Sequence, residues 1–304
     1  MMNFKLAVTA ALSVLSLCAY GEPAKKPSES GQPAGIVLKG SDIVKPAIED
    51  ALMELAKRER ISLSLDMRGT YPLLREDSPE PFDAAVVAVP KGGKLPSDLV
   101  AIPFAYQVAM VVVNAANPIE EISTDTLRKI YSKVSSGRIE SWSQVGVRYA
   151  GLRNILALIT GYSDGIYVEL FKNSSFDGGE LGDWVTMMKD SSEVLSNVRV
   201  NNSAIGIVGR VYDKNMVKIL SVSDSSSGGN YRYSFLPNQA SVFNGDYPMT
   251  LSYYIVFKRE NAKKVKKLVS ILLGSQIADR LDAKGFFSAP PESRKKSLFE
   301  LDIL

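Results

Sequence analysis

Apolar and polar residues follow two recurring patterns along this chain, and together the patterns predict strands that alternate with helices. Asp83–Val89 is a nearly continuous apolar run, which is typical of a strand covered on both faces. Between such runs apolar residues recur at helical spacing, as with Ala47, Ile48, Leu52 and Leu55. Strands that alternate with helices in this way predict an α/β architecture.

The remaining elements extend this alternation to the end of the chain. Leu99–Asn114 is apolar but too long for one ordinary strand, so it predicts two strands or one strand that crosses between lobes. Ser123 is a good N-cap for the helix that follows it. Further strands are expected at Ile36–Leu38, Ile61–Leu65, Ile155–Ile159, Val198–Val200, Ile205–Gly209, Ile219–Val222 and Met249–Lys258, and further helices at Asn261–Leu273 and Ser275–Lys284.

The first 21 residues have the pattern of an export signal. Lys5 precedes the apolar core Leu6–Leu17, which is shorter than the roughly 20 residues of a membrane span. Cleavage before Glu22 would give a periplasmic or extracytoplasmic protein, whereas a lipid anchor on Cys18 is the second possibility. Residues 22–35 are rich in Pro, Ser, Gly and Lys and predict a flexible tether, which suits either outcome.

Composition narrows the chemistry that this chain can perform. The chain has 304 residues with no histidine and one cysteine, Cys18, which lies inside the leader. The commonest general base and metal ligand is therefore missing, and disulfides, cysteine nucleophiles and zinc clusters are excluded after the leader. The net charge of +3 gives no indication of nucleic acid as a partner.

Five segments occur in an informative order. They are Gly40–Pro46, Val111–Gly146, Asn201–Gly209, Gly245–Lys258, and Gly274–Ile277 with Gly285–Phe287. In this order they resemble the phosphate-binding proteins of ABC importers, which belong to the periplasmic binding protein type II superfamily. The resemblance covers most of the chain after the leader.

The resemblance implies a two-lobed fold, with each lobe a mostly parallel sheet flanked by helices and a ligand cleft between the lobes. Residues 36–106 and 249–304 would form lobe I, and residues 107–248 lobe II. The hinge is expected near Pro103–Val108 and Gly245–Thr250, where the chain would cross.

The implied function is that of a binder rather than an enzyme. The resemblance implies a monomer that captures a small inorganic oxyanion, with phosphate first. It implies no metal, no cofactor and no catalytic residue. The captured anion would be delivered to the membrane permease of an ABC importer.

The resemblance also places candidate ligand-binding residues in the first lobe. Ser41 and Asp42 stand in its first binding loop, where helix capping is the alternative role of Ser41. Arg68, Gly69 and Thr70 stand in its second binding loop, where an ordinary surface turn is the alternative. A guanidinium, hydroxyls and helix N-termini are the groups that bind anions without a metal.

The candidates in the second lobe depart from the family pattern. Ser163 matches a Ser-Gly-Thr motif, but Asp164 replaces its Gly and Gly165 replaces its Thr. The family's preceding arginine is also missing, so Arg148, Arg153 and Arg210 are the candidates to replace it.

The first lobe departs as well, because Val87 and Ala88 stand where the family has a polar cluster. Three outcomes therefore stay open: phosphate in a modified site, another small ligand, or no ligand at all. In the last case the chain would be a degenerate member that acts as a sensor or as an envelope interaction protein. The motif Ser293-x-x-Lys296 lies in a polar tail without supporting motifs, so it does not predict an enzyme.

Overall fold

The computed structural model describes residues 35–70, 73–74, 81–133, 136–149, 151–213, 215–225 and 233–304. Residues 34–304 form one compact unit, which is the subject of all that follows. The predicted leader, its Cys18 and nearly all of the tether lie outside the described residues. Among the described residues, no helix is long and apolar enough to cross a membrane.

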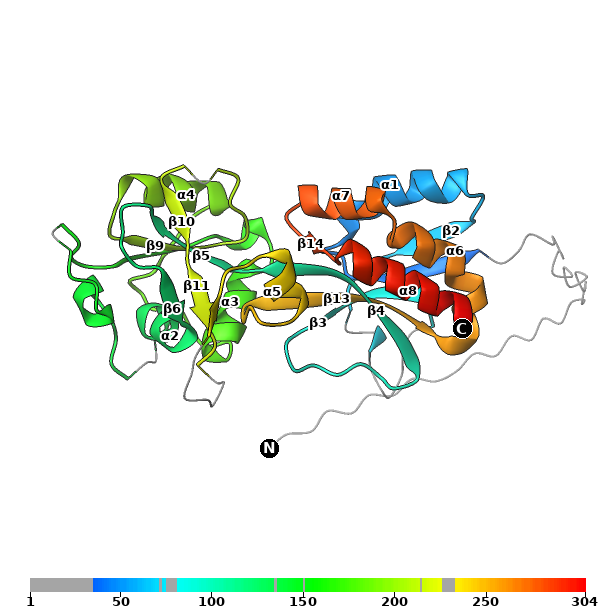
Figure 1. Cartoon of the computed structure of the whole chain (residues 1–304), viewed down its shortest axis with the longest axis horizontal. Coiled ribbons are helices and arrows are strands. Elements are labelled where there is room, and N and C mark those ends of the chain that lie inside the picture. The colour runs from blue at the N-terminus through cyan, green and yellow to red at the C-terminus, as the bar shows by residue number, and fades with distance from the viewer. Residues whose placement is uncertain are drawn as a thin grey trace, which may run out of the picture. The chain divides into compact units, whose positions relative to one another are not determined.

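A six-stranded mixed sheet organises the first lobe (Figure 1), in the order β14-β4-β13-β3-β1-β2. Its strands are β1 (Ile36–Gly40), β2 (Leu63–Asp66), β3 (Ala84–Val89), β4 (Leu99–Val108), β13 (Thr250–Lys258) and β14 (Phe287–Ser288). The helices of this lobe are α1 (Lys45–Arg58), α6 (Ala262–Leu272), α7 (Ser275–Ala283) and α8 (Pro291–Ile303). α1 and α7 lie side by side, and α6 packs against both of them.

A five-stranded mixed sheet organises the second lobe, in the order β10-β5-β9-β7-β8. Its strands are β5 (Met110–Asn114), β7 (Leu156–Ile159), β8 (Thr186–Met187), β9 (Ala204–Val208) and β10 (Val217–Ile219). The helices are α2 (Thr124–Tyr131), α3 (Tyr167–Phe176), α4 (Ser191–Val200) and α5 (Gln239–Phe243), of which α5 also contacts β4 and β14 of the first sheet. Short 3₁₀ turns lie at η2 (Trp142–Val145) and η3 (Tyr162–Asp164), and a third, η4 (Arg259–Asn261), joins β13 to α6 in the first lobe. A small third sheet joins β6 (Glu121–Ser123), β11 (Ser221–Ser223) and β12 (Ser234–Phe235).

The predicted α/β class with sheets flanked by helices is confirmed, but each sheet mixes parallel and antiparallel pairs rather than being mostly parallel. β1 pairs in parallel with β2 and β3, and β7 with β8 and β9. β4 leaves the first sheet and β13 returns to it, so these two strands run in opposite directions side by side. Because the chain leaves the first sheet through β4 and returns through β13, these two strands pair in antiparallel fashion.

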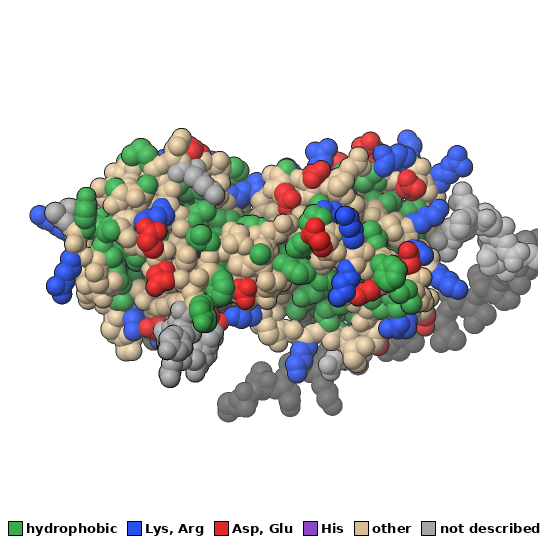
Figure 2. All heavy atoms as spheres, in the orientation of Figure 1, with side chains coloured by type: hydrophobic (Ala, Val, Ile, Leu, Met, Phe, Trp, Pro, Cys, Tyr) green, Lys and Arg blue, Asp and Glu red, His purple; other side chains and the backbone are tan. Residues whose placement is uncertain are grey.

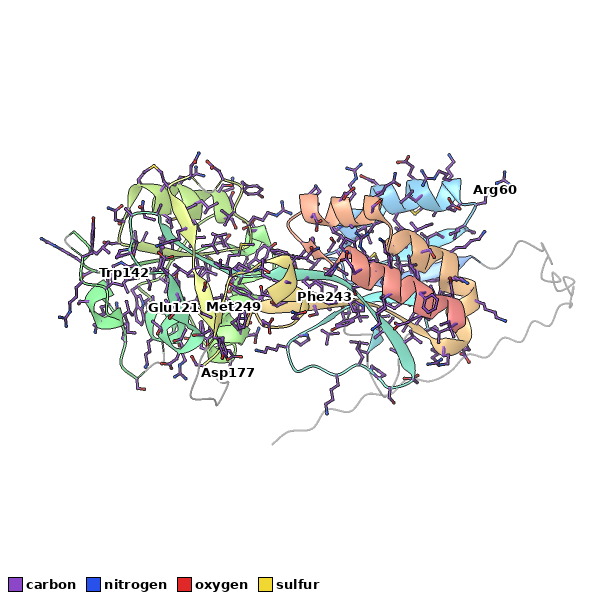
Figure 3. The ribbon with its side chains drawn as sticks, in the orientation of Figure 1. Arg60, Glu121, Trp142, Asp177, Phe243 and Met249 are labelled. Atoms are coloured by element: carbon purple, nitrogen blue, oxygen red, sulfur yellow. The ribbon has the colours of Figure 1, made fainter. Side chains whose placement is uncertain are left out.

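The chain passes between the two sheets within one residue. β4 ends at Val108 in the first sheet and β5 begins at Met110 in the second. Ala109 donates its N–H to the carbonyl of Met249 at 3.1 Å, and its carbonyl accepts from the Tyr247 hydroxyl at 2.8 Å. The apolar run Leu99–Asn114 thus forms two strands that belong to different sheets. Figure 3 marks Met249 beside this crossing and Trp142 inside the second lobe.

Most of the predicted elements are present, and one is wrong. Ser123 caps α2 as predicted, since its side chain accepts from the Thr126 N–H at 3.1 Å. Val198–Val200, which was predicted as a strand, is the last turn of α4. This helix begins at the N-cap Asp190, whose carboxylate accepts from the Glu193 N–H at 3.0 Å, and it buries Val194, Leu195 and Val198 against the sheet.

Candidate functional site

The carboxyl ends of the parallel strands carry the predicted site residues of both lobes. In open α/β sheets ligands bind in the crevice outside these strand ends. In the first lobe the ends are those of β1, β2 and β3, which are neighbours in the sheet. In the second lobe β7 and β9 are neighbours and run in parallel, so the loops that follow them leave from the same edge.

Ser41 follows β1 and is buried. Its N–H donates to the carbonyl of Val86 at 2.8 Å, and its hydroxyl accepts from the Ile43 N–H at 3.3 Å. It does not cap α1, whose N-cap position is Val44. The backbone donor of Ser41 is therefore already used, and its hydroxyl also lies within hydrogen-bonding reach of the Tyr253 hydroxyl. Asp42 beside it is exposed.

The second predicted loop turns most of its polar groups toward the protein. Arg68 is 77% exposed and forms an ion pair with Asp66, with 2.7 Å between Nη2 and Oδ2. This hydrogen bond lowers the pKa of the Asp66 carboxyl. Thr70 accepts from the Ala88 N–H at 3.1 Å, and the N–H of Gly69 donates to the Gly40 carbonyl at 2.8 Å. The loop is thus fastened to β1 and β3, which matches its alternative role as a structural turn.

Asp164 is turned into the second lobe. Its Oδ2 accepts from the Thr160 hydroxyl at 2.8 Å, from the Ser191 N–H at 3.0 Å and from the Ser191 hydroxyl. The Oδ2 atom therefore joins the end of β7 to the start of α4. Its neighbour Ser163 donates its hydroxyl to the Lys189 carbonyl at 2.7 Å, and Gly165 adopts a φ of +118°.

A buried chain of polar side chains joins the two lobes. The Tyr253 hydroxyl on β13 donates to Oε1 of Gln107 on β4 at 2.6 Å, and Nε2 of Gln107 lies 3.5 Å from the hydroxyl of Tyr167. Tyr167 is the first residue of α3 and is only 3% exposed. Burial raises the pKa of Tyr167, and the positive charge of Arg210 opposes that rise.

Arg210 is the cation that the fold brings to the strand ends. It follows β9 directly after Gly209, whose N–H donates to the Ser191 hydroxyl at 3.1 Å. Its Nη1 donates to the Tyr212 hydroxyl at 3.2 Å. Nε of Arg210 lies so close to Gly285 that a Cβ there would come within 2.0 Å of it. The guanidinium therefore reaches from the second lobe to the turn before β14.

The other two candidate arginines lie elsewhere. Arg148 and Arg153 are exposed and flank the 3₁₀ turn of Trp142, whose N–H donates to the Arg153 carbonyl at 3.2 Å. The sequence did not distinguish among the three candidate arginines. Arg210 differs from the other two because it follows the end of β9.

Ile159 occupies the end of β7, four residues before Ser163, and is fully buried.

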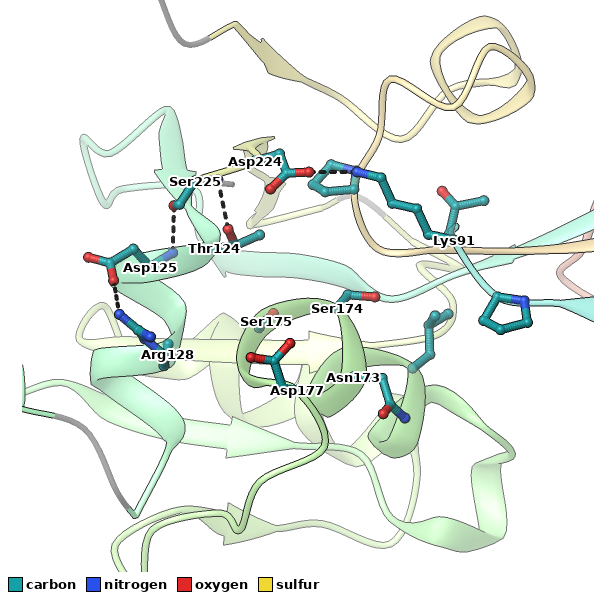
Figure 4. Close-up of a pocket in the computed structure, with 14 residues that line it drawn as sticks. Lys91, Thr124, Asp125, Arg128, Asn173, Ser174, Ser175, Asp177, Asp224 and Ser225 are labelled. Atoms are coloured by element: carbon teal, nitrogen blue, oxygen red, sulfur yellow. Dashed lines mark hydrogen bonds and ion pairs between the residues drawn. The ribbon is translucent and has the colours of Figure 1, made fainter. Parts of the chain in front are cut away.

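Two cavities adjoin this region. One of about 460 Å³ opens beside Arg210, and one of about 700 Å³ lies between α2, α3 and the loop after β3 (Figure 4). In the larger cavity Lys91 pairs with Asp224 at 2.5 Å and Arg128 pairs with Asp125, while Asp177 lines the wall as a further carboxylate. No group of three or more possible metal-ligating side chains occurs among the residues that the structure describes.

Two α/β lobes that are joined by crossing strands, with loops from both at the strand ends, form the fold of the periplasmic binding protein type. The chain belongs to the family of the PBP superfamily domain, whose model matches residues 28–275. Protein SphX of Synechococcus elongatus is 26% identical over 282 residues, which are 87% of this chain and 80% of that protein. The family and fold are those of transport binding proteins.

Solved structures agree on the fold. A possible phosphate binding protein from Planctomyces limnophilus has a TM-score of 0.66 at 19% identity, covering 88% of this chain and 98% of that one. PstS from Borrelia burgdorferi has a TM-score of 0.65 at 20% identity, covering 84% and 98%. An ABC-type phosphate transport receptor from Vibrio cholerae has a TM-score of 0.58 at 17% identity, covering 83% and 99%.

Proposed function

We propose that this protein is an exported solute-binding protein that captures a small oxyanion, phosphate first, between its two lobes and delivers it to the permease of an ABC importer. The observation that carries the proposal is the placement of Arg210 at the strand ends, beside the hydroxyl of Tyr167 and the turn at Gly285. The names of the similar proteins, which describe phosphate binding and phosphate transport, support the same ligand.

The anion would be held by groups from both lobes. Arg210 supplies a fixed positive charge, and the hydroxyls of Ser41 and Thr70 are the nearest match to the donors of the family, whereas the Ser163 hydroxyl would first have to release the Lys189 carbonyl. The hydrogen bond of 3.5 Å between Gln107 and Tyr167 is the weakest link of the buried chain, so its opening would admit a ligand at low cost. Binding would close the lobes, which we divide at 36–106 with 249–304 and at 107–248, without breaking a covalent bond.

The test is isothermal titration of the refolded protein from Glu22 onward with phosphate, and with sulfate and molybdate beside it. A charge-assisted hydrogen bond contributes about 1.5–3 kcal/mol, so Arg210→Gln should weaken phosphate binding by roughly 10- to 100-fold. Arg148→Gln is the matched control, because this exposed arginine lies beside the Trp142 turn and should leave the affinity unchanged. Equal binding by both variants would remove Arg210 from the site.

The second candidate function is that of a sensor or envelope interaction protein without an anion ligand. Apolar Ala88 and buried Ile159 at the strand ends favour it, as does the hydrogen-bonded chain that fills the space between Tyr253 and Tyr167. In that case no oxyanion would give heat or a thermal shift, and copurification of a protein partner from the envelope would be the next measurement.

A further inference from the structure

The cavity beside Arg210 is larger than an inorganic ion requires, and one part of its wall is apolar. Its volume is about 460 Å³, which falls within the range of roughly 300–1,000 Å³ found for sites of small organic molecules. Part of its wall is apolar, and these side chains come from Met110, Val211, Phe286 and Phe287. Such walls stabilise an apolar body by removing its surface from water and offer nothing to a hydrated ion.

The polar groups of the cavity gather at Arg210. Within the described part of the chain no carboxylate forms an ion pair with this guanidinium, which bonds to the Tyr212 hydroxyl and lies 5.8 Å from the centre of that ring. Asp282, the acidic residue of the wall, already accepts from the N–H of Ser288 at 2.8 Å and from its hydroxyl at 3.2 Å. The cavity thus has one cation with donors to spare and one carboxylate that is satisfied within its own lobe.

We infer that this cavity binds an organic anion, namely a phosphonate or phosphate monoester whose compact apolar body lies against Phe286 and Phe287 while its charged head lies on Arg210. The inference deepens the proposed function and rests on it, because the head would take the same place at Arg210 as inorganic phosphate. Gln239 lies at the mouth of the cavity, where its Nε2 donates to the Ser288 carbonyl at 3.3 Å and its carbonyl oxygen can accept from a hydroxyl on the ligand.

The experiment compares phenylphosphonate with inorganic phosphate by isothermal titration of the full mature protein. Ala283, an exposed residue at the C-terminal end of α7, lines the cavity, so Ala283→Trp should fill it without disturbing the core. Ala116→Trp, at an exposed position after β5, is the matched control. Thermal unfolding verifies that each variant is folded.

We expect wild-type protein to bind phenylphosphonate at least as tightly as phosphate. Ala283→Trp should weaken phenylphosphonate binding at least tenfold and change phosphate binding less than twofold, whereas Arg210→Gln should weaken both. Phosphate binding without phenylphosphonate binding would overturn the inference and leave the proposed function standing. Phenylphosphonate binding without phosphate binding would support the inference and remove phosphate from the proposed function. Equal losses for both ligands in Ala283→Trp, or binding of neither ligand by wild-type protein, would also overturn the inference.

Discussion

The carboxylate of Asp164 accepts the backbone N–H of Ser191 at 3.0 Å, which ties the loop after β7 to the first residue of α4. The hydroxyl of Ser191 in turn accepts the N–H of Gly209 at 3.1 Å, directly before Arg210. One carboxylate therefore organises the loops at the ends of both β7 and β9. This role gives an acidic residue at the helix start a structural function.

Asp164→Asn should lower the free energy of unfolding by about 1.5–3 kcal/mol, because it removes charge-assisted hydrogen bonds from a partly buried group. Urea denaturation measures the loss. Asp50→Asn, on the exposed face of α1, is the control and should change stability by less than about 0.5 kcal/mol. A loss in Asp164→Asn that is no larger than in the control would contradict the anchoring role.

Gly40 and Gly69 offer a matched pair, since both have positive φ, at +133° and +139°. A Cβ at Gly40 would lie 2.0 Å from the Val86 carbonyl oxygen, whereas a Cβ at Gly69 would meet nothing within 4 Å. Gly69→Ala should therefore cost only backbone strain of about 1–3 kcal/mol. Gly40→Ala should cost more than about 4 kcal/mol, because the strand pair must also separate. Similar unfolding midpoints for the two variants would refute this difference.

Lys91 and Asp224 join the loop after β3 to the end of β11, and the ion pair measures 2.5 Å. Lys91→Gln should accelerate hydrogen exchange at the N–H groups of Asp125 and Ser225. The Asp125 N–H donates to the Ser225 hydroxyl, and the Ser225 N–H donates to the Thr124 hydroxyl. The effect should be smaller at 1 M salt, because salt weakens ion pairs that are exposed to solvent. Lys218→Gln removes an equally short pair with Glu120 away from this cavity and is the control. Unchanged exchange in Lys91→Gln at low salt would show that the pair does not hold the loops together.

The buried hydroxyl of Tyr247 should make the free energy of unfolding depend on pH in the alkaline range. Its hydroxyl is buried and donates to the Ala109 carbonyl at 2.8 Å, and burial raises its pKa above the ordinary value. The unfolded chain then releases this proton first, near pH 10, so the stability that Tyr247 contributes is complete below that pH and is lost as the pH rises.

Tyr247→Phe should therefore lower the free energy of unfolding by about 1–3 kcal/mol at pH 7, where the Ala109 carbonyl loses its partner. Above pH 10 the gap from wild type should narrow by at most about 1.4 kcal/mol per pH unit. Denaturant titrations of both proteins at pH 7, 10 and 11 measure this difference in the free energy of unfolding. A constant gap over this range would contradict the raised pKa of Tyr247. Tyr233→Phe, at an exposed tyrosine, is the control and should show no such trend.

The described residues on the face shown in Figure 2 do not form a patch of one charge. On the face shown in Figure 2, basic and acidic side chains are interspersed over both lobes rather than gathered into a stripe. This distribution agrees with the small net charge of +3. The chemistry of the chain is therefore best sought at its strand ends and in the cavity beside Arg210.

The strand predicted at Val198–Val200 shows where local patterns fail. Two β-branched residues around Arg199 favour a strand in isolation, but the segment completes a helix that begins at Asp190 and packs Val198 against β9. Leu99–Asn114 shows the opposite case. Its length alone indicated two strands or a crossing, and the chain does both around Ala109.

The sequence by itself determined the α/β class and most of its elements, because hydrophobic periodicity and turn residues act locally along the chain. The family followed from the resemblance carried by five motifs in order. Only the tertiary structure decided the roles of the site residues. Asp164 turns inward, Thr70 fastens its loop to β3, and Arg210 alone of three candidate arginines reaches the strand ends. These roles depend on hydrogen bonds and contacts between segments far apart in the chain, and a side chain's direction is fixed only when its partners are in place.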